Sequence, residues 1–262
     1  MKRFVAAALA CASLALFVDT PSAARDDKPP AMRFEWRLEG PAEQCGTHCR
    51  TWISATGVIT EDTARAFETF ARNNEVRGAR LVLDSEGGSV LSAMALGRAI
   101  RNFDMTTTVG RTVLLPSDGQ SQQRATISHS ASCESMCAFI LLAGTRRYVP
   151  SEARVLVHQI WLGAKSKRAR ETSYSAEELQ LVQRDVGRLV RYTAEMGGSM
   201  ELVETALRVP PWEPMHRLSA DELRRMKITT VDHLFEPDLT SAPVAAVTPN
   251  ALTTSAQGQG PR

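Results

Sequence analysis

A serine and a histidine occupy positions from which they could do chemistry together. Ser135 lies in CESMCAFILLAG (133–144), where it opens an apolar run, and His158 lies in the strand-like VHQI (157–160). A nucleophilic serine needs a base within hydrogen-bond reach and backbone N–H groups aimed at the developing oxyanion. The two residues therefore suggest a serine nucleophile with a histidine general base. The alternative is that Ser135 only caps a helix and that His158 is an ordinary core residue.

A glycine pair in DSEGG (84–88) is a third feature of this kind. It ends the short apolar segment ARLVLDS (79–85), and a helical pattern begins directly after it at Ser89. A glycine turn at the end of a strand can offer a backbone N–H to a substrate, because glycine allows the backbone to approach closely. A serine at a helix start leaves the next N–H at the positive end of the helix dipole. Together these features indicate a site that combines one hydroxyl with backbone donors.

Strands and helices are expected to alternate around these residues. Strand-like segments are expected at 52–59, 79–85, 105–110 and 153–161. A helix with Thr60 as its N-cap is expected to present Ala64, Phe67 and Phe70 on one apolar face, and a second helical pattern begins at Ser89. A long amphipathic helix is expected through 179–190. Repeated strand-then-helix order predicts a mostly parallel sheet with right-handed crossovers. The polar, turn-rich stretch between Thr112 and Ser132 is expected to be an insertion loop.

Three segments together resemble the ClpP peptidase family. WISATGVITEDTARAFETFARNNEVRGARLVLDSEGGSVLSAMALGRAIR (52–101) is similar to the opening of that family, and SCESMCAFILLAGTRRYVPSEARVLVHQI (132–160) is similar to its nucleophile segment. HRLSADELRRMKITTVD (216–232) resembles the closing segment, so the likeness covers roughly residues 50–232. The resemblance implies an α/β fold of the ClpP/crotonase type, a ββα superhelix with a mostly parallel sheet.

The resemblance also assigns roles to individual residues. It implies that Ser135 is the nucleophile, that His158 is the general base, and that the N–H groups of Gly87 and Met136 form the oxyanion hole. It implies neither a cofactor nor a metal ion. The predicted substrates are peptides or unfolded proteins, and self-association into a homo-oligomer is plausible for this fold.

Two departures from the family pattern concern the same site. Cys137 stands where the family has glycine after Ser-Met, and Cys133 replaces a small residue before the serine. The family's aspartate would fall near Pro211, where this chain has none; Glu213 is the closest substitute, and Asp185 is a second candidate. A serine protease that loses this acid loses about 10⁴-fold in turnover.

The chain ends indicate export. Lys2 and Arg3 precede an apolar run from Phe4 to Val18, and PSAA (21–24) follows it, which is typical of a signal peptide over residues 1–24. Residues 25–33 are expected to be flexible, residues 34–236 to form the ClpP-like domain, and residues 237–262 to be a disordered tail rich in Ser, Thr, Pro, Gly and Ala. The formal charge of +2 gives no electrostatic case for nucleic acid. The expected location is the periplasm or the extracellular space.

Four cysteines remain after the predicted cleavage, as the two C-x3-C pairs Cys45/Cys49 and Cys133/Cys137. In an oxidising compartment disulfides are favoured, and the pairing stays open. Zinc is the weaker alternative, because structural zinc sites commonly use C-x2-C and His48 alone does not complete a ligand set.

These observations favour an exported serine hydrolase that cleaves peptide bonds of short or unfolded chains through an acyl-enzyme. No ATP-driven unfoldase is expected as a partner, because ATP is lacking outside the cytoplasm. The second hypothesis is a catalytically weak or inactive relative that binds peptides or a partner protein, and the missing aspartate favours it. A crotonase acting on acyl-CoA is the third, and the Ser-Met and His-Gln motifs argue against it.

Overall fold

The computed structural model describes residues 29–116, 123–162, 170–171, 173–233 and 235. The predicted signal peptide (1–24) and tail (237–262) lie outside these residues. Within the part of the chain that is described, no helix is both long and apolar enough to cross a bilayer.

The elements alternate along the chain much as the sequence predicts. The strands are β1 (Arg33–Glu39), β2 (Thr51–Thr56), β3 (Arg80–Asp84), β4 (Thr106–Val109), β5 (Arg111–Leu114), β6 (Arg124–Ser128), β7 (Ser132–Glu134), β8 (Arg147–Tyr148), β9 (Arg154–Val157) and β10 (His216–Arg217). The helices are α1 (Ala42–Cys45), the short 3-10 helix η1 (Gly46–His48), α2 (Thr63–Arg72), α3 (Val90–Asn102), α4 (Met136–Leu141), α5 (Ala176–Glu195), α6 (Met200–Leu207) and α7 (Ala220–Arg225).

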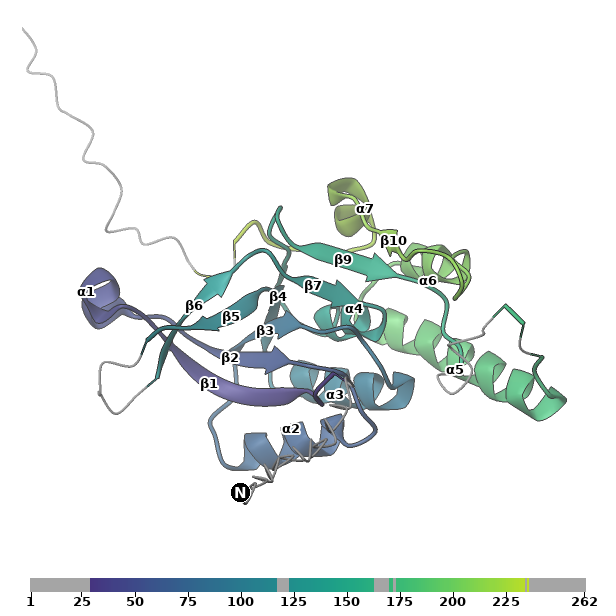
Figure 1. Ribbon diagram of the computed structural model, residues 1–262, viewed down its shortest axis with the longest axis horizontal. Coiled ribbons are helices and arrows are strands. Elements are labelled where there is room, and N and C mark those ends of the chain that lie inside the picture. The colour runs from purple at the N-terminus through teal and green to yellow at the C-terminus, as the bar shows by residue number, and fades with distance from the viewer. Residues whose placement is uncertain (1–28, 117–122, 163–169, 172, 234, 236–262) are drawn as a thin grey trace, which may run out of the picture.

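The large sheet has seven strands in the order β5-β6-β1-β2-β3-β4-β8 (Figure 1). Four of its six pairings are parallel, and β1–β2 and β5–β6 are antiparallel. The parallel run β2-β3-β4-β8 is connected through helices, as crossover connections require. The predicted α/β fold with a mostly parallel sheet is therefore confirmed.

A smaller sheet, β10-β9-β7, holds the two segments that carry Ser135 and His158. It meets the large sheet just beyond the end of β3, where Ser85 forms a parallel bridge to Cys133. The Ser85 N–H donates to the Ser132 carbonyl at 3.0 Å, and the Glu134 N–H donates to the Ser85 carbonyl at 2.9 Å. This junction places the DSEGG turn beside the end of β7.

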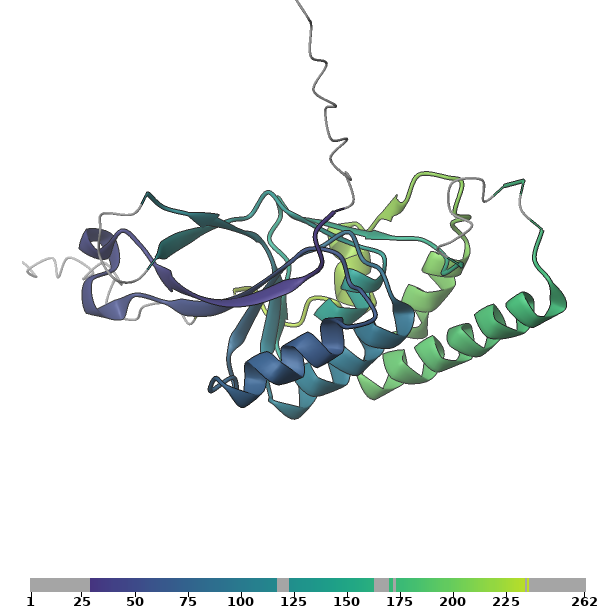
Figure 2. The same cartoon turned by 60° about the horizontal axis from the view of Figure 1, so that its bottom comes forward.

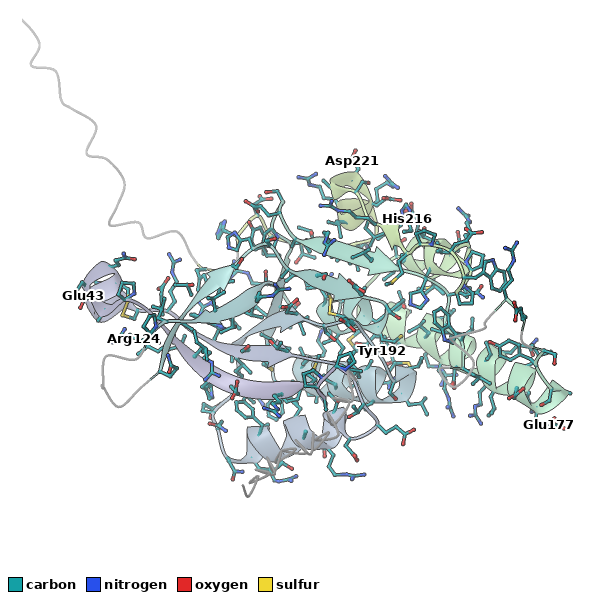
Figure 3. The ribbon with its side chains drawn as sticks, in the orientation of Figure 1. Glu43, Arg124, Glu177, Tyr192, His216 and Asp221 are labelled. Atoms are coloured by element: carbon teal, nitrogen blue, oxygen red, sulfur yellow. A yellow bond between two sulfur atoms is a disulfide. The ribbon has the colours of Figure 1, made fainter. Side chains whose placement is uncertain are left out.

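Helices α2, α3 and α5 lie side by side below the large sheet (Figure 2), with α2 against β1 and α3, and α5 against α3 and α6. The predicted apolar face of α2 is confirmed, because Phe67 is fully buried and its ring packs edge-on against that of Phe34. Tyr192 of α5, labelled in Figure 3, lies against Gly97 of α3 so closely that a Cβ on Gly97 would be 1.7 Å from the tyrosine hydroxyl. That hydroxyl donates to the Phe139 carbonyl at 2.8 Å, which ties α5 to α4.

Two arginines satisfy carbonyl groups at the end of α4. Arg101 donates from Nε to the Ala143 carbonyl at 2.8 Å, and Arg147 donates from Nη1 to the Gly144 carbonyl at 2.8 Å. Burial of the Arg147 side chain, together with the nearby Arg101 charge, lowers its pKa to about 10. Ala143 and Gly144 come just after α4, so these contacts hold the chain at the end of the helix that follows the nucleophile segment.

The structure corrects three expectations about the elements. Helix α2 has Asp62 rather than Thr60 at its N-cap position, and the stretch expected to be an insertion loop contains β6, which pairs with β1 and β5. The last part of the predicted flexible segment 25–33 is ordered, because the Met32 N–H donates to the Val58 carbonyl at 2.8 Å and β1 begins at Arg33.

Candidate active site

Ser135 occupies a sharp turn between β7 and α4. Its φ of 54° and ψ of −121° lie in the left-handed half of the map, which costs a non-glycine residue of order 1–3 kcal/mol. Its N–H donates to the Leu156 carbonyl of β9 at 2.8 Å, so the neighbouring strand fixes the turn. The Ser135 side chain does not cap α4, and its hydroxyl has no hydrogen-bond partner among the described residues. A strained serine with an uncommitted hydroxyl at a strand-to-helix turn is the geometry of a nucleophile elbow.

Gly87 lies directly against this turn. Its φ is 87°, and a Cβ placed on it would lie 2.8 Å from the Ser135 Cβ and 3.1 Å from the Met136 nitrogen. The turn is held there by the Ile59 N–H, which donates to the Gly87 carbonyl at 2.8 Å. The structure therefore brings the glycine turn, Ser135 and Met136 together, as the sequence predicts.

The backbone N–H groups at this turn differ in whether they already have a hydrogen-bond acceptor. The Met136 N–H, at the first position of α4, has no acceptor within the described residues. The Gly87 N–H donates to the Ser85 Oγ at 3.2 Å, so it would have to give up that bond to serve an oxyanion. The next N–H, that of Gly88, has no acceptor in the described part of the chain. Sequence reasoning did not single out Gly88, because either glycine of the pair could serve.

His158 follows the end of β9 and is half-buried. Its Nδ1 lies 2.8 Å from the Gln159 carbonyl oxygen, and its ring lies 4.6 Å from that of Trp161. With the proton on Nδ1, the ring donates to that carbonyl and leaves Nε2 as the basic nitrogen. Burial lowers the pKa of His158, while the Gln159 carbonyl and the negative charge of Glu134 act in the opposite direction. The imidazole is therefore neutral at pH 7, as a general base must be.

Ser135 and His158 lie at the same end of the small sheet because β7 and β9 run parallel, with Glu134 opposite Leu156. No hydrogen bond joins the Ser135 hydroxyl to the His158 ring. Catalytic hydrogen bonds are often long or poorly aligned in enzymes without substrate and tighten in the complex.

The predicted third member, Glu213, does not reach this site. It is exposed, it forms no hydrogen bond or ion pair with His158, and its N–H donates to the Pro210 carbonyl at 3.1 Å. That hydrogen bond closes a turn in the proline-rich segment VPPWEP (209–214). The second candidate, Asp185, pairs instead with Arg188 of its own helix at 3.1 Å. The structure therefore supports neither acid as the partner of His158.

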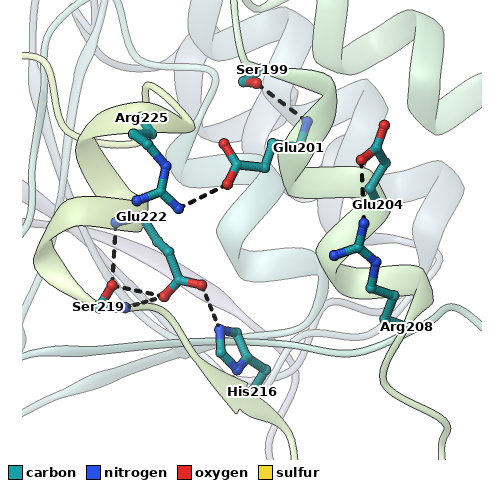
Figure 4. Close-up of polar contacts among 8 residues, drawn as sticks. All are labelled: Ser199, Glu201, Glu204, Arg208, His216, Ser219, Glu222 and Arg225. Carbon is teal, nitrogen blue, oxygen red and sulfur yellow. Dashed lines mark hydrogen bonds and ion pairs between the residues drawn. The ribbon is translucent and has the colours of Figure 1, made fainter.

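The loop after α6 supports β9 from the other side. The Gln159 N–H donates to the Val209 carbonyl at 3.0 Å, and β10 pairs with β9. Figure 4 shows how β10 is anchored: His216 Nε2 lies 2.9 Å from Glu222 Oε1, and Glu222 closes a capping box with Ser219. The Ser219 backbone N–H contributes most, ahead of His216, to lowering the pKa of Glu222 to about 2.

The cysteines pair within each C-x3-C motif, as Cys45–Cys49 and Cys133–Cys137. Cys133 is the middle residue of β7, and its side chain points into the core. Cys137 lies in the first turn of α4, so the second disulfide spans the Ser135 turn. Both of its half-cystines are fully buried. The pairing could not be read from the sequence, and oxidation of all four thiols after export stays a prediction.

A strained serine, a neutral histidine and an adjoining glycine turn on this α/β fold define the class of ClpP-like proteins. The family model named Clp protease matches residues 54–208, which is more than half of the 262 residues, and the chain belongs to this family. The match lies inside the region of resemblance inferred from the sequence. No curated protein matches the chain.

Proposed function

We propose that this chain is an exported serine peptidase that cleaves short or unfolded polypeptides through an acyl-enzyme on Ser135. The observation that carries the proposal is the left-handed Ser135 with its uncommitted hydroxyl, next to Gly87 and Met136. Strained backbone conformations cluster at functional sites, and an ordinary helix cap would not need one. The strained Ser135 turn therefore supports a catalytic role for its hydroxyl.

In this mechanism His158 Nε2 removes the proton from Ser135 Oγ as the oxygen attacks the peptide carbonyl carbon. The Met136 N–H and a glycine N–H of the turn stabilise the oxyanion. The imidazolium then donates its proton to the departing amine, which leaves an ester on Ser135. A water molecule, deprotonated by His158, hydrolyses that ester and releases the acid.

Export is supported by the N-terminal pattern of residues 1–24 and by the two cysteine pairs. With no ATP in that compartment, the substrates are chains that need no unfolding, and no ATP-driven unfoldase is a partner. A homo-oligomer built on this fold is part of the proposal.

A binding protein with little or no catalytic activity is the second candidate. Two observations favour it: neither Glu213 nor Asp185 contacts His158, and no hydrogen bond joins His158 to Ser135. Such a protein would hold peptides at the same turn without turnover.

Hydrolysis of an unfolded protein such as reduced, alkylated casein distinguishes the two. The peptidase proposal predicts that the purified protein releases peptides, that Ser135→Ala abolishes the release, and that Ser132→Ala leaves it unchanged. Ser132 is a suitable control because it is a half-buried serine three residues earlier, at the start of β7. Binding of the casein with no peptide release would favour the second candidate.

A further inference from the structure

The outward face of the small sheet carries an acidic residue next to the nucleophile. Side chains alternate along a strand, and Cys133, Val155 and Val157 point into the core. Glu134 and Leu156 are half-buried and belong to the other face. His158 is also half-buried and lies two residues beyond Leu156, so it continues the same face.

The register places Glu134 and His158 diagonally across the two strands. Glu134 is opposite Leu156, so His158 lies one strand across and two residues along from it. Strand spacing and rise put such Cα atoms about 8 Å apart, a distance that two long side chains on one face can span. Within the described residues, the Glu134 carboxylate forms no hydrogen bond or ion pair, so it is free to act on His158 through its charge.

We propose that Glu134 is a positioning residue for catalysis, supplying the negative charge that His158 lacks because the family's aspartate is missing. This inference rests on the proposed peptidase function. The carboxylate stabilises the imidazolium that forms when Ser135 gives up its proton, while the Gln159 carbonyl holds the Nδ1 proton and fixes the tautomer. The catalytic aspartate of a serine protease both fixes the histidine tautomer and stabilises the imidazolium. Here a backbone carbonyl performs the first task and the Glu134 carboxylate performs the second.

The other charged groups on the elements around His158 are either bonded to other partners or exposed to solvent. His216 on β10 is paired with Glu222, and Arg217 donates to the Ala153 carbonyl at 3.4 Å. Glu86 in the glycine turn, Arg154 on β9 and Glu213 in the loop after α6 are exposed. Consistent with the geometry, burial lowers the pKa of His158, and Glu134 is the side chain whose negative charge opposes that effect.

The test compares Glu134→Gln with Glu213→Gln, a matched loss of one carboxylate nearby. The first readout is the NMR titration of the His158 ring in a Ser135→Ala background, which does not depend on activity. We expect Glu134→Gln to lower the pKa of His158 and Glu213→Gln to leave it unchanged. The second readout is the rate of fluorophosphonate labelling against pH with Ser135 intact. We expect Glu134→Gln to slow labelling about tenfold at the plateau and to move the rise to lower pH.

The outcomes separate this inference from the proposed function. If the wild type is labelled but Glu134→Gln matches it in rate and in the pKa of His158, the role of Glu134 is refuted and the peptidase stands. A slower Glu134→Gln with an unchanged pKa of His158 would reduce Glu134 to a structural residue and also refute the inference. A folded wild type that is not labelled refutes the peptidase and, with it, any role of Glu134 in activating Ser135.

Discussion

Replacing Gly87 by alanine tests whether the close packing of the glycine turn against Ser135 is needed for the reactivity of Ser135. A Cβ at this position would lie 2.6 Å from the Glu134 carbonyl oxygen and 2.8 Å from the Ser135 Cβ. Both neighbours are at or near the backbone and cannot rotate away, so the turn must move. Gly197 provides the control, because its φ is also positive, at 68°, and a Cβ there would meet no atom within 4 Å.

The two substitutions share one cost and differ in another. Each places alanine in the left-handed region, which costs about 1–2 kcal/mol. Gly87→Ala adds the steric cost of an overpacked site, typically about 1–3 kcal/mol. We therefore expect Gly197→Ala to lower the free energy of unfolding by about 1–2 kcal/mol and Gly87→Ala by about 2–5 kcal/mol. Urea unfolding of both variants measures the difference.

The effect on chemistry should separate the variants further. Moving the turn away from Ser135 removes an oxyanion donor, a change that costs about 10²–10³ in rate in a serine protease. We expect fluorophosphonate labelling of Gly87→Ala to slow by at least about 100-fold and that of Gly197→Ala to stay at the wild-type rate. Labelling of Gly87→Ala at the wild-type rate, with unfolding no weaker than that of Gly197→Ala, would refute this reasoning.

Two further predictions concern the supports of the site. Replacing Cys133 and Cys137 by alanine removes the cross-link of a short loop, so the free energy of unfolding should fall by about 2 kcal/mol and labelling should slow. The same double change at Cys45 and Cys49 removes the cross-link of a loop of equal length. It should leave labelling unchanged, and equal labelling in both double variants would contradict a role for the disulfide in positioning Ser135. The second concerns Glu222, whose folded pKa of about 2 lies below the usual carboxyl value. Its stabilisation is present above about pH 4.5 and is lost as pH falls toward 2. Glu222→Gln should therefore unfold at lower urea than the wild type at pH 6 but not at pH 2; a difference independent of pH would contradict this.

The main features of the fold could be predicted because each is local in sequence. The apolar period that contains Phe67 predicts an amphipathic helix, and the run before the DSEGG turn predicts a buried strand. Ser135 at the start of an apolar run and His158 in a strand are also local features. Their place at the same end of the small sheet follows from the parallel pairing of β7 and β9; the strand at 153–161 was predicted, but β7 was not.

The errors concern features set by tertiary contacts. Strand β6 is polar and half-exposed, and it is held by pairing with β1, which lies far from it in the sequence. The position of Glu213 depends on a turn closed by the Pro210 carbonyl, which proline content alone does not reveal. Glu134 was overlooked for the opposite reason. It lies next to the nucleophile, and only the register of β7 against β9 relates it to His158.

Mapping the fluorophosphonate adduct by tandem mass spectrometry tests directly whether Ser135 is a nucleophile that His158 activates. Wild-type protein and His158→Ala are treated under the same conditions, and the fold of each is checked by circular dichroism. We expect one modified residue, Ser135, in the wild type, and little modification in His158→Ala because the hydroxyl then lacks its base. A folded wild-type protein with no adduct, or with the adduct on another serine, would contradict this expectation.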